Sequence, residues 1–329
     1  MKSNKVLVLG ATGGIGGEVA RQLKSAGWEV CALSRHVEKG IDQLEGLTWL
    51  QGDALNRQDV TEAAKGCSVI VHAVNPPGYR RWSELVLPML DNTIAAALVE
   101  GATIVLPGTV YNFGPDAFPV LHEHSRQHPQ TRKGAIRVEM EQRLRKAAGD
   151  GARVLIVRAG DFFGPRAGNN WFSMGLIKPG RPVKAVNYPG ERGVAHQWAY
   201  LPDVARTMVQ LLERRTMLDA FESFHMAGHL DIDGTQMSRA IQRVVFQHTG
   251  TQPRVTAFPW WLLSVAAPFV VTFREMLEMR YLWRTPVQMD NARLIEVLGS
   301  EPHTPLDEAV EAALVGGGCI SRDAVAMNS

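Results

Sequence analysis

The chain has 329 residues, 45% of them apolar, with 35 Lys and Arg against 33 Asp and Glu. A domain holds roughly 100–200 residues, so one large domain or two closely packed ones are expected. The net charge of +2 offers no surplus of one sign, so nucleic acid is not an expected partner, and the apolar content excludes a disordered chain. Three widely spaced cysteines, and a strand-like run directly after Met1, predict a cytoplasmic protein.

Short, β-branched apolar runs alternate with longer amphipathic ones over the first 160 residues. The predicted strands are 6–9, 29–33, 47–50, 69–74, 103–106 and 154–157, and the predicted helices are 17–25, 58–65, 82–99 and 131–148. These strands are apolar throughout, as expected when both faces of a sheet are covered. The alternation predicts an α/β protein with a Rossmann-type, doubly wound parallel sheet.

The alternation stops after residue 160. A loop-rich stretch follows, and then predicted helices at 202–214, 234–248, 260–283, 290–298 and 305–314, with a strand near 223–227. We therefore expect a dinucleotide-binding domain over residues 1–160 and a smaller, mostly helical substrate cap over 161–329. Some elements of the cap are expected to return to the sheet.

Glycines follow the first predicted strand and open the first predicted helix. Because they permit a tight turn and a close backbone approach, and the helix end carries free N–H groups, this loop predicts a site for a dinucleotide pyrophosphate. The predicted loop contacts are Gly10, Thr12, Gly13, Gly14, Ile15 and Gly16.

The second predicted strand ends in Ser34 and Arg35, where an NAD-binding fold usually carries a carboxylate. A guanidinium suits a 2′-phosphate, so NADP is preferred and NAD is the alternative, unless Arg35 is only a solvated loop residue. Asp53, next to Ala54, is expected to contact the adenine or else to cap the following helix. Three residues after the fourth strand are expected to form the wall beside the nicotinamide ribose: Ala73, Val74 and Asn75.

The chain resembles the extended and atypical branches of the short-chain dehydrogenase/reductase superfamily, within the NAD-dependent epimerase/dehydratase family. Besides the glycine loop, the resemblance rests on Val110-Tyr111, on the segment from Arg158 to Pro165, on Leu201-Pro202-Asp203-Val204-Ala205, and on the ending from Leu298 to Leu306. It implies an NAD(P)-dependent enzyme, commonly a homodimer through the helices at 82–99 and 131–148. Arg158 is included in the predicted cofactor site.

The usual catalytic side chains of that family are missing. Lys133 and Arg137 stand where it carries Tyr and Lys, and Pro107 stands where it carries Ser or Thr, with Thr109 two residues later. Both basic side chains head the stripe expected to face the sheet, so Lys133 is a candidate acid or base. The alternative is that both extend to water. Tyr79 is a further candidate for the missing phenol.

The substrate site is expected in the loops at the same sheet edge. Its predicted residues are Tyr111, Asn169, Asn170, Trp171 and His196. No metal site is predicted, because the tract of His122, His124 and His128 lacks companion ligands.

The leading hypothesis is an NAD(P)H-dependent oxidoreductase that reduces a small carbonyl substrate. A non-catalytic NADP(H)-binding regulator is the alternative, and a sugar-nucleotide epimerase or dehydratase is third. Residues 255–273 carry no formal charge, but Pro259 and Pro268 interrupt them. Trp260, Trp261, Leu262, Leu263 and Phe269 are therefore expected in the cap core or against an apolar substrate, and membrane contact is not expected.

Overall fold

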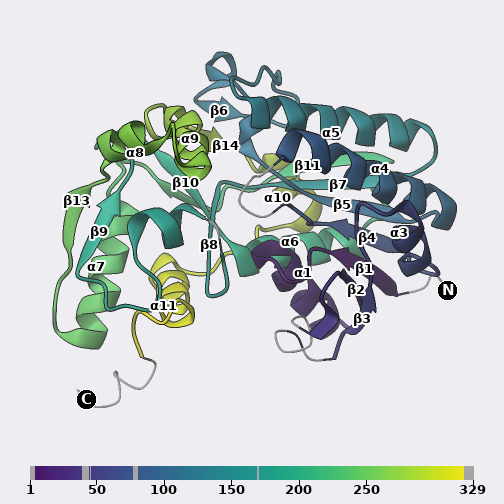
Figure 1. Ribbon diagram of the computed structural model, residues 1–329, viewed down its shortest axis with the longest axis horizontal. Helices are drawn as coiled ribbons and strands as arrows, with labels where there is room; N and C mark the ends of the chain where they lie inside the picture. Colours follow the sequence, from purple (N-terminus) through teal and green to yellow (C-terminus); the bar gives the residue numbers. More distant parts are fainter. Residues whose placement is uncertain (1–3, 39–43, 45, 77–80, 169, 322–329) are drawn as a thin grey trace.

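The computed structural model describes residues 4–38, 44, 46–76, 81–168 and 170–321. Within these residues, seven parallel strands form a sheet in the order β11-β7-β5-β4-β1-β2-β3 (Figure 1). Their bounds are β1 (Lys5–Leu9), β2 (Glu29–Ser34), β3 (Thr48–Gln51), β4 (Val69–His72), β5 (Thr103–Gly108), β7 (Arg153–Arg158) and β11 (Phe221–His225). The predicted doubly wound α/β fold is confirmed. Strand order reverses between β1 and β4, which opens a crevice at their carboxyl ends.

Helices cover both faces of the sheet, as the apolar strands require. One face packs against α1 (Gly14–Ser25), α6 (Leu201–Glu213) and α10 (Ala292–Leu298). The other packs against α3 (Arg57–Ala63), α4 (Trp82–Glu100) and α5 (Arg132–Gly149). Along β1, Val6 and Val8 join the first core while Leu7 and Leu9 join the second, so successive residues serve opposite layers.

The cap is built from small sheets and helices at the other end of the molecule (Figure 1). Its strands are β8 (Asp161–Phe163), β10 (His196–Tyr200), β12 (His229–Asp231), β9 (Ala185–Tyr188), β13 (Arg254–Ala257), β6 (Val120–Leu121) and β14 (Gln288–Met289). Its helices are α7 (Gln236–Thr249), α8 (Trp260–Ala266), α9 (Val271–Glu278) and α11 (Leu306–Gly316), with short helical turns at Val110–Asn112, Pro115–Ala117, Phe172–Leu176 and Arg280–Trp283. Strand β11 follows residue 160 in the chain yet pairs in the large sheet, and helices α6 and α10, also after residue 160, pack on that sheet. Conversely, β6 and the turns at Val110–Asn112 and Pro115–Ala117 precede residue 160 but pack with cap residues. The domain boundary at 160 stays a prediction.

The predicted single helix over 260–283 is wrong. The chain forms α8, breaks, and resumes as α9. Pro268 lies in the break, where it supplies no N–H and resists the helical conformation of the residue before it. Trp260 and Leu263 are buried as expected, whereas Trp261, Leu262 and Phe269 are exposed, so their prediction as core or pocket wall is wrong. In the described part of the chain, no helix is both long and apolar enough to cross a membrane.

Candidate active site

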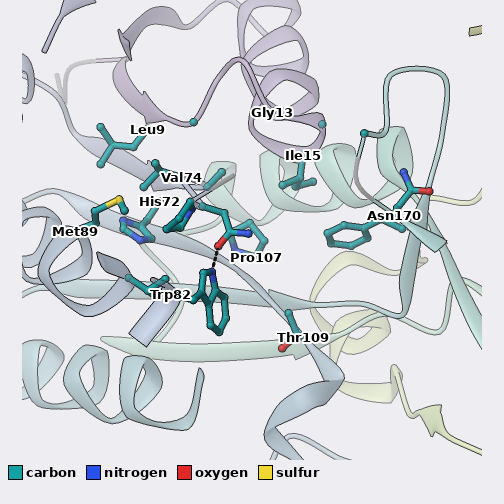
Figure 2. Close-up of a pocket in the computed structure, with 18 of the residues that line it drawn as sticks. Leu9, Gly13, Ile15, His72, Val74, Trp82, Met89, Pro107, Thr109 and Asn170 are labelled. Carbon is teal, nitrogen blue, oxygen red and sulfur yellow. Dashed lines mark hydrogen bonds between the residues drawn. The ribbon is translucent and has the colours of Figure 1, made fainter. Parts of the chain in front are cut away.

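The crevice at the carboxyl edge of the sheet is a cavity of about 750 Å³. It runs between the loop after β1, the ends of β4 and β5, the first turns of α4 and α5, and helix α9 of the cap. Figure 2 shows Gly13 and Ile15 on one side of this space, His72 and Trp82 on another, and Asn170 across from them. A cavity of this size accommodates a small-molecule ligand.

The loop after β1 is held by close backbone packing. Gly10 has φ +90°, and a Cβ there would lie 2.5 Å from the carbonyl oxygen of Ala73. A Cβ on Gly16 would overlap the carbonyl oxygen of Gly10. The amide of Gly13 donates to that same oxygen at 2.9 Å, and α1 begins at the next residue with no acidic side chain in its first turn. The positive end of α1 thus faces the cavity, which fits an anionic pyrophosphate.

Most of the residues predicted for the cofactor line this cavity. They are Gly10, Thr12, Gly13, Gly14, Ile15, Ser34, Arg35, Asp53, Ala54, Ala73, Val74 and Asn75. Gly16 does not line it and serves instead the packing of α1 on the loop. Their individual roles toward a cofactor stay predictions.

At the predicted adenosine end, Arg35 is exposed and borders the cavity. The hydroxyl of Ser34 is hydrogen-bonded locally, to the backbone N and O of His36 at 3.1 Å each. A carboxylate oxygen of Asp53 accepts from the amide of Leu55 at 3.0 Å, and Asn56, not Asp53, caps α3. Asp53 therefore shapes the turn while keeping its place on the cavity wall.

His72, the last residue of β4, is one of the residues that line the cavity. Its Nδ1 lies 2.8 Å from Oγ1 of Thr93, and that hydroxyl donates to the carbonyl of Met89 at 3.1 Å. Because the hydroxyl's proton is committed, Nδ1 carries the ring proton and Nε2 keeps its lone pair. Nε2 is buried and has no hydrogen-bond partner among the described residues. Burial, together with the charge of Arg137, lowers the pKa of His72 to about 3, so the ring is neutral.

Lys133 lies buried in the first turn of α5, at the cavity. Its Nζ is 2.8 Å from Oε2 of Glu275 on α9, 142 residues further along the chain. Thr131 caps the helix by accepting from the amide of Gly134 at 3.0 Å. Arg137, one turn later, donates to the carbonyl of Pro107 at 3.4 Å and lies 5.3 Å from the ring centre of Trp82. The predicted approach of Lys133 and Arg137 to the cleft matches these positions.

The wall at the end of β4 is tied to α4. The indole N–H of Trp82 donates to the side-chain oxygen of Asn75, the interaction drawn as a dashed line in Figure 2. Two predicted residues, Tyr79 and Asn169, lie outside the described residues.

Thr109 belongs to a buried polar network that fixes the loop after β5. Its hydroxyl donates to Asn112 at 3.3 Å, and its carbonyl accepts from Nη1 of Arg158 at 2.5 Å. Nη2 of Arg158 donates to both oxygens of Glu141 at 2.8 Å, and its Nε donates to Nε2 of His225 at 3.2 Å. Arg158 is thus engaged within the protein and does not line the cavity. We correct its placement: it positions the loop that carries Thr109.

The predicted substrate residues divide into two groups. Tyr111, Asn170 and Trp171 line the cavity. His196 does not: its Nε2 lies 2.9 Å from Oδ2 of Asp161, and its ring stacks on Trp283 with centroids 3.7 Å apart. That packing places His196 in the cap core, because its strand β10 runs behind the cavity wall.

Sequence reasoning missed the cap side of the site. Glu275 and Met276 of α9, Met279 directly after it, and Arg166 line the cavity. From the layer of the large sheet, four residues of α4 that were also missed line it: Trp82, Leu85, Val86 and Met89. No local pattern distinguishes Glu275, because only the docking of α9 on α5 brings it to Lys133. No cluster of metal-ligating side chains occurs in the part of the chain that the structure describes.

A sequence profile described as the NAD dependent epimerase/dehydratase family matches residues 6–227. Among curated proteins, the mouse (Mus musculus) sterol-4-alpha-carboxylate 3-dehydrogenase, decarboxylating, is 33% identical over 84 residues, which are 26% of this chain and 22% of that protein. A 2-alkyl-3-oxoalkanoate reductase of Shewanella oneidensis is 31% identical over 101 residues, 31% of this chain and 25% of the relative. The matches thus span about a quarter or less of the length of these relatives.

Solved structures share the fold along nearly the whole chain. A UDP-glucose 4-epimerase from Brucella ovis in complex with NAD superimposes with a TM-score of 0.73 and 17% identity, covering 96% of this chain and 99% of that one. At this identity the likeness concerns the fold. Together with the profile match it confirms the resemblance stated from the sequence.

Proposed function

The chain belongs to the NAD dependent epimerase/dehydratase family, and on that premise we propose that it is an NAD(P)H-dependent oxidoreductase that reduces the carbonyl group of a small substrate. The observation that carries the proposal is the buried ammonium of Lys133, held at the same cavity as the glycine loop. The glycine loop forms one edge of this cavity and fits the phosphates of a dinucleotide. Residues of the cap form another wall of the same cavity.

The proposed roles follow from where each group lies. A bound nicotinamide would supply the hydride for the carbonyl carbon. Lys133 would donate a proton from Nζ to the carbonyl oxygen, so that hydride and proton together give the alcohol. Glu275 positions Nζ through the contact at 2.8 Å, and the positive charge of the ammonium stabilises negative charge developing on that oxygen. The adjacent Arg137 adds a second fixed cation.

The test measures NADPH and NADH oxidation with a panel of ketones and aldehydes, alongside nucleotide affinity. Lys133→Ala should lower kcat/KM by about 10²–10⁴-fold, the usual contribution of a positioned proton donor, while nucleotide affinity stays near that of the unchanged protein. Lys146→Ala is the matched control, because Lys146 lies on the same helix but is exposed and paired with Asp150.

Two outcomes would reject the proposal. A protein that binds neither nucleotide has no oxidoreductase function of this kind. If the protein binds nucleotide without turnover, and Lys133→Ala leaves that binding unchanged, the result would instead favour a non-catalytic regulator.

We further propose that NADP is preferred to NAD. Support comes from Arg35, which is exposed at the cavity just after β2, at the predicted position of the ribose 2′ substituent. Arg35→Gln should weaken NADPH binding by about 10–100-fold, the loss expected for a charge-assisted hydrogen bond, and leave NADH binding nearly unchanged. Arg192→Gln, an exposed arginine of the cap, is the control. Equal or tighter binding of NADH by the unchanged protein would contradict the preference.

A further inference from the structure

Within the uncharged run over residues 255–273, only Trp260, Leu263 and Ala267 are buried among the residues whose burial is described. Trp260 and Leu263 point into the cap core, and the indole N–H of Trp260 donates to the carbonyl of Pro189 at 2.8 Å. No residue of α8 is charged, and Ser264 is its one polar residue. A helix that is apolar on nearly all sides normally has both faces covered.

The outward face of α8 and its flanking residues is uncovered. Six large apolar side chains of this segment are exposed, and together we call them the α8 patch: Val255 (40% exposed), Trp261 (71%), Leu262 (47%), Val265 (67%), Phe269 (89%) and Val270 (38%). Trp261 and Val265, four residues apart, lie on one face of α8, and Phe269 and Val270 follow the end of that helix. An exposed apolar patch of this kind marks a surface that contacts another body.

The charges around the α8 patch identify its partner class. Arg254 and Arg274 flank the patch in the chain, and both are exposed. No ion pair involves either guanidinium within the described ranges. The neighbouring acidic side chains face α5 instead: Glu275 pairs with Nζ of Lys133, and Glu278 accepts from the amide of Arg132 at 2.8 Å. The surface is therefore apolar with a cationic margin.

We propose that the α8 patch docks on an anionic phospholipid bilayer, with Trp261 and Phe269 at the acyl boundary and Arg254 and Arg274 at the headgroup phosphates. Aromatic and aliphatic tips with a basic margin are the composition of interfacial anchors that lie on a membrane without spanning it. A second copy of the chain is disfavoured as partner, because a two-fold contact through the patch would bring its arginines toward each other.

The position of the patch fits such docking. Helices α8 and α9 lie together at the outer edge of the cap (Figure 1). Glu275 and Met276 of α9, and Met279 directly after it, line the cavity from the inside. A bilayer on the α8 patch would thus lie along the outer side of one cavity wall. The proposal reverses the expectation drawn from the sequence and is independent of the proposed reaction.

The test is sedimentation of the full chain with vesicles of phosphatidylcholine alone or with about 30% phosphatidylglycerol. The protein should bind the anionic vesicles, and raising the salt from about 0.05 to 0.5 M should weaken that binding. Trp261→Ser with Phe269→Ser should lower the partition coefficient at least about tenfold, since two large apolar side chains no longer leave water. Arg254→Gln and Arg274→Gln should each lower it roughly fivefold on anionic vesicles.

The control carries Met217→Ser with Phe246→Ser, which removes two other exposed apolar side chains and should leave vesicle binding unchanged. Protein that stays in the supernatant with both vesicle types overturns the proposal, and so does equal loss of binding in the control. Light scattering tests for the competing partner, a second copy of the chain. If the protein does not bind vesicles but forms an oligomer, and Trp261→Ser dissociates that oligomer, the patch is a contact between copies and the proposal is overturned. Nucleotide affinity, which the patch does not touch, reports folding of every variant.

Discussion

Gly10 and Gly16 let two backbone segments meet where a side chain would separate them. Gly10 packs on the backbone of Ala73 at the end of β4, and Gly16 packs on the carbonyl of Gly10. The loop, the start of α1 and the chain after β4 are therefore placed relative to one another by close backbone packing. The shape of this edge of the cavity, where a pyrophosphate is predicted to bind, depends on these contacts.

Gly16→Ala is expected to damage this edge. The new Cβ would overlap Gly10 O and lie 3.1 Å from Cβ of Ala73, so α1 must shift away from the loop. We expect a loss of about 1–3 kcal/mol in the free energy of unfolding, as for overpacking, and at least tenfold weaker nucleotide binding. Urea unfolding and nucleotide titration measure the two effects.

Gly149→Ala is the matched control for this substitution. Gly149 ends α5, and a Cβ there would meet no atom within 4 Å. Helix propensity then predicts unchanged or slightly higher stability and unchanged binding. Equal nucleotide affinity in the two variants would show that close packing at Gly16 does not shape the site.

Residue identity predicted the arrangement of strand, glycine loop and helix well, because the signal is local. A strand, glycines and a helix follow one another within 25 residues, and each requires the next. Arg158 shows the limit. Its position at the end of β7 was readable, and alternation along the strand sends it to the same layer as Val154 and Ile156, but its pairing there with Glu141 was not readable. Only the fold shows that partner.

At the scale of elements, the cap closes the site by docking α9 on the start of α5. Two carboxylates make this contact, Glu275 to the side chain of Lys133 and Glu278 to the backbone amide of Arg132. The second satisfies a free N–H at the positive end of a helix, where an anion is favoured. Sequence reasoning could not foresee it, because the pattern predicted one long helix over 260–283 and the break after α8 sets the orientation of α9.

Glu278→Ala should loosen this contact without altering Lys133 itself. Loss of a charged acceptor at a helix N-terminus costs about 0.5–2 kcal/mol, so α9 should open more often. Hydrogen exchange of the amides in α9 should quicken by about 2–30-fold, while the strands of the large sheet keep their rates. Glu62→Ala, which removes an exposed pair with Lys65 on the surface, should change neither. Unchanged exchange in α9 would show that Glu278 does not hold it.

At the scale of the whole molecule, three buried histidines form no ion pair with an acidic side chain of the described residues. Burial and Arg137 lower the pKa of His72 to about 3, burial and Arg158 lower that of His225 to about 3, and burial and His303 lower that of His229 to about 4. His225 shows the cause most directly, since its Nε2 accepts from Nε of Arg158 and its Nδ1 lies 3.3 Å from the carbonyl of Leu121. A second ring proton would point at a guanidinium.

These depressed values predict acid destabilisation. In the unfolded chain the rings titrate near 6.5, so above that pH both states are neutral and the contribution to stability is complete. Below about pH 6.5 these histidines are protonated in the unfolded chain, whereas in the folded protein they stay neutral until about pH 3–4. The free energy of unfolding therefore falls by up to about 1.4 kcal/mol per pH unit for each histidine. Urea unfolding between about pH 7.5 and 4.5 should show this decline.

His225→Gln separates this effect from a purely structural one. Glutamine offers a carbonyl oxygen to Arg158 but binds no proton, so the variant should lose roughly a third of the slope below pH 6.5, whatever its stability at neutral pH. His36→Gln, which replaces an exposed ring, should keep the full slope. A slope in His225→Gln equal to that of the unchanged protein would mean that His225 binds its proton equally well in the folded and unfolded states, and that it does not cause the acid sensitivity.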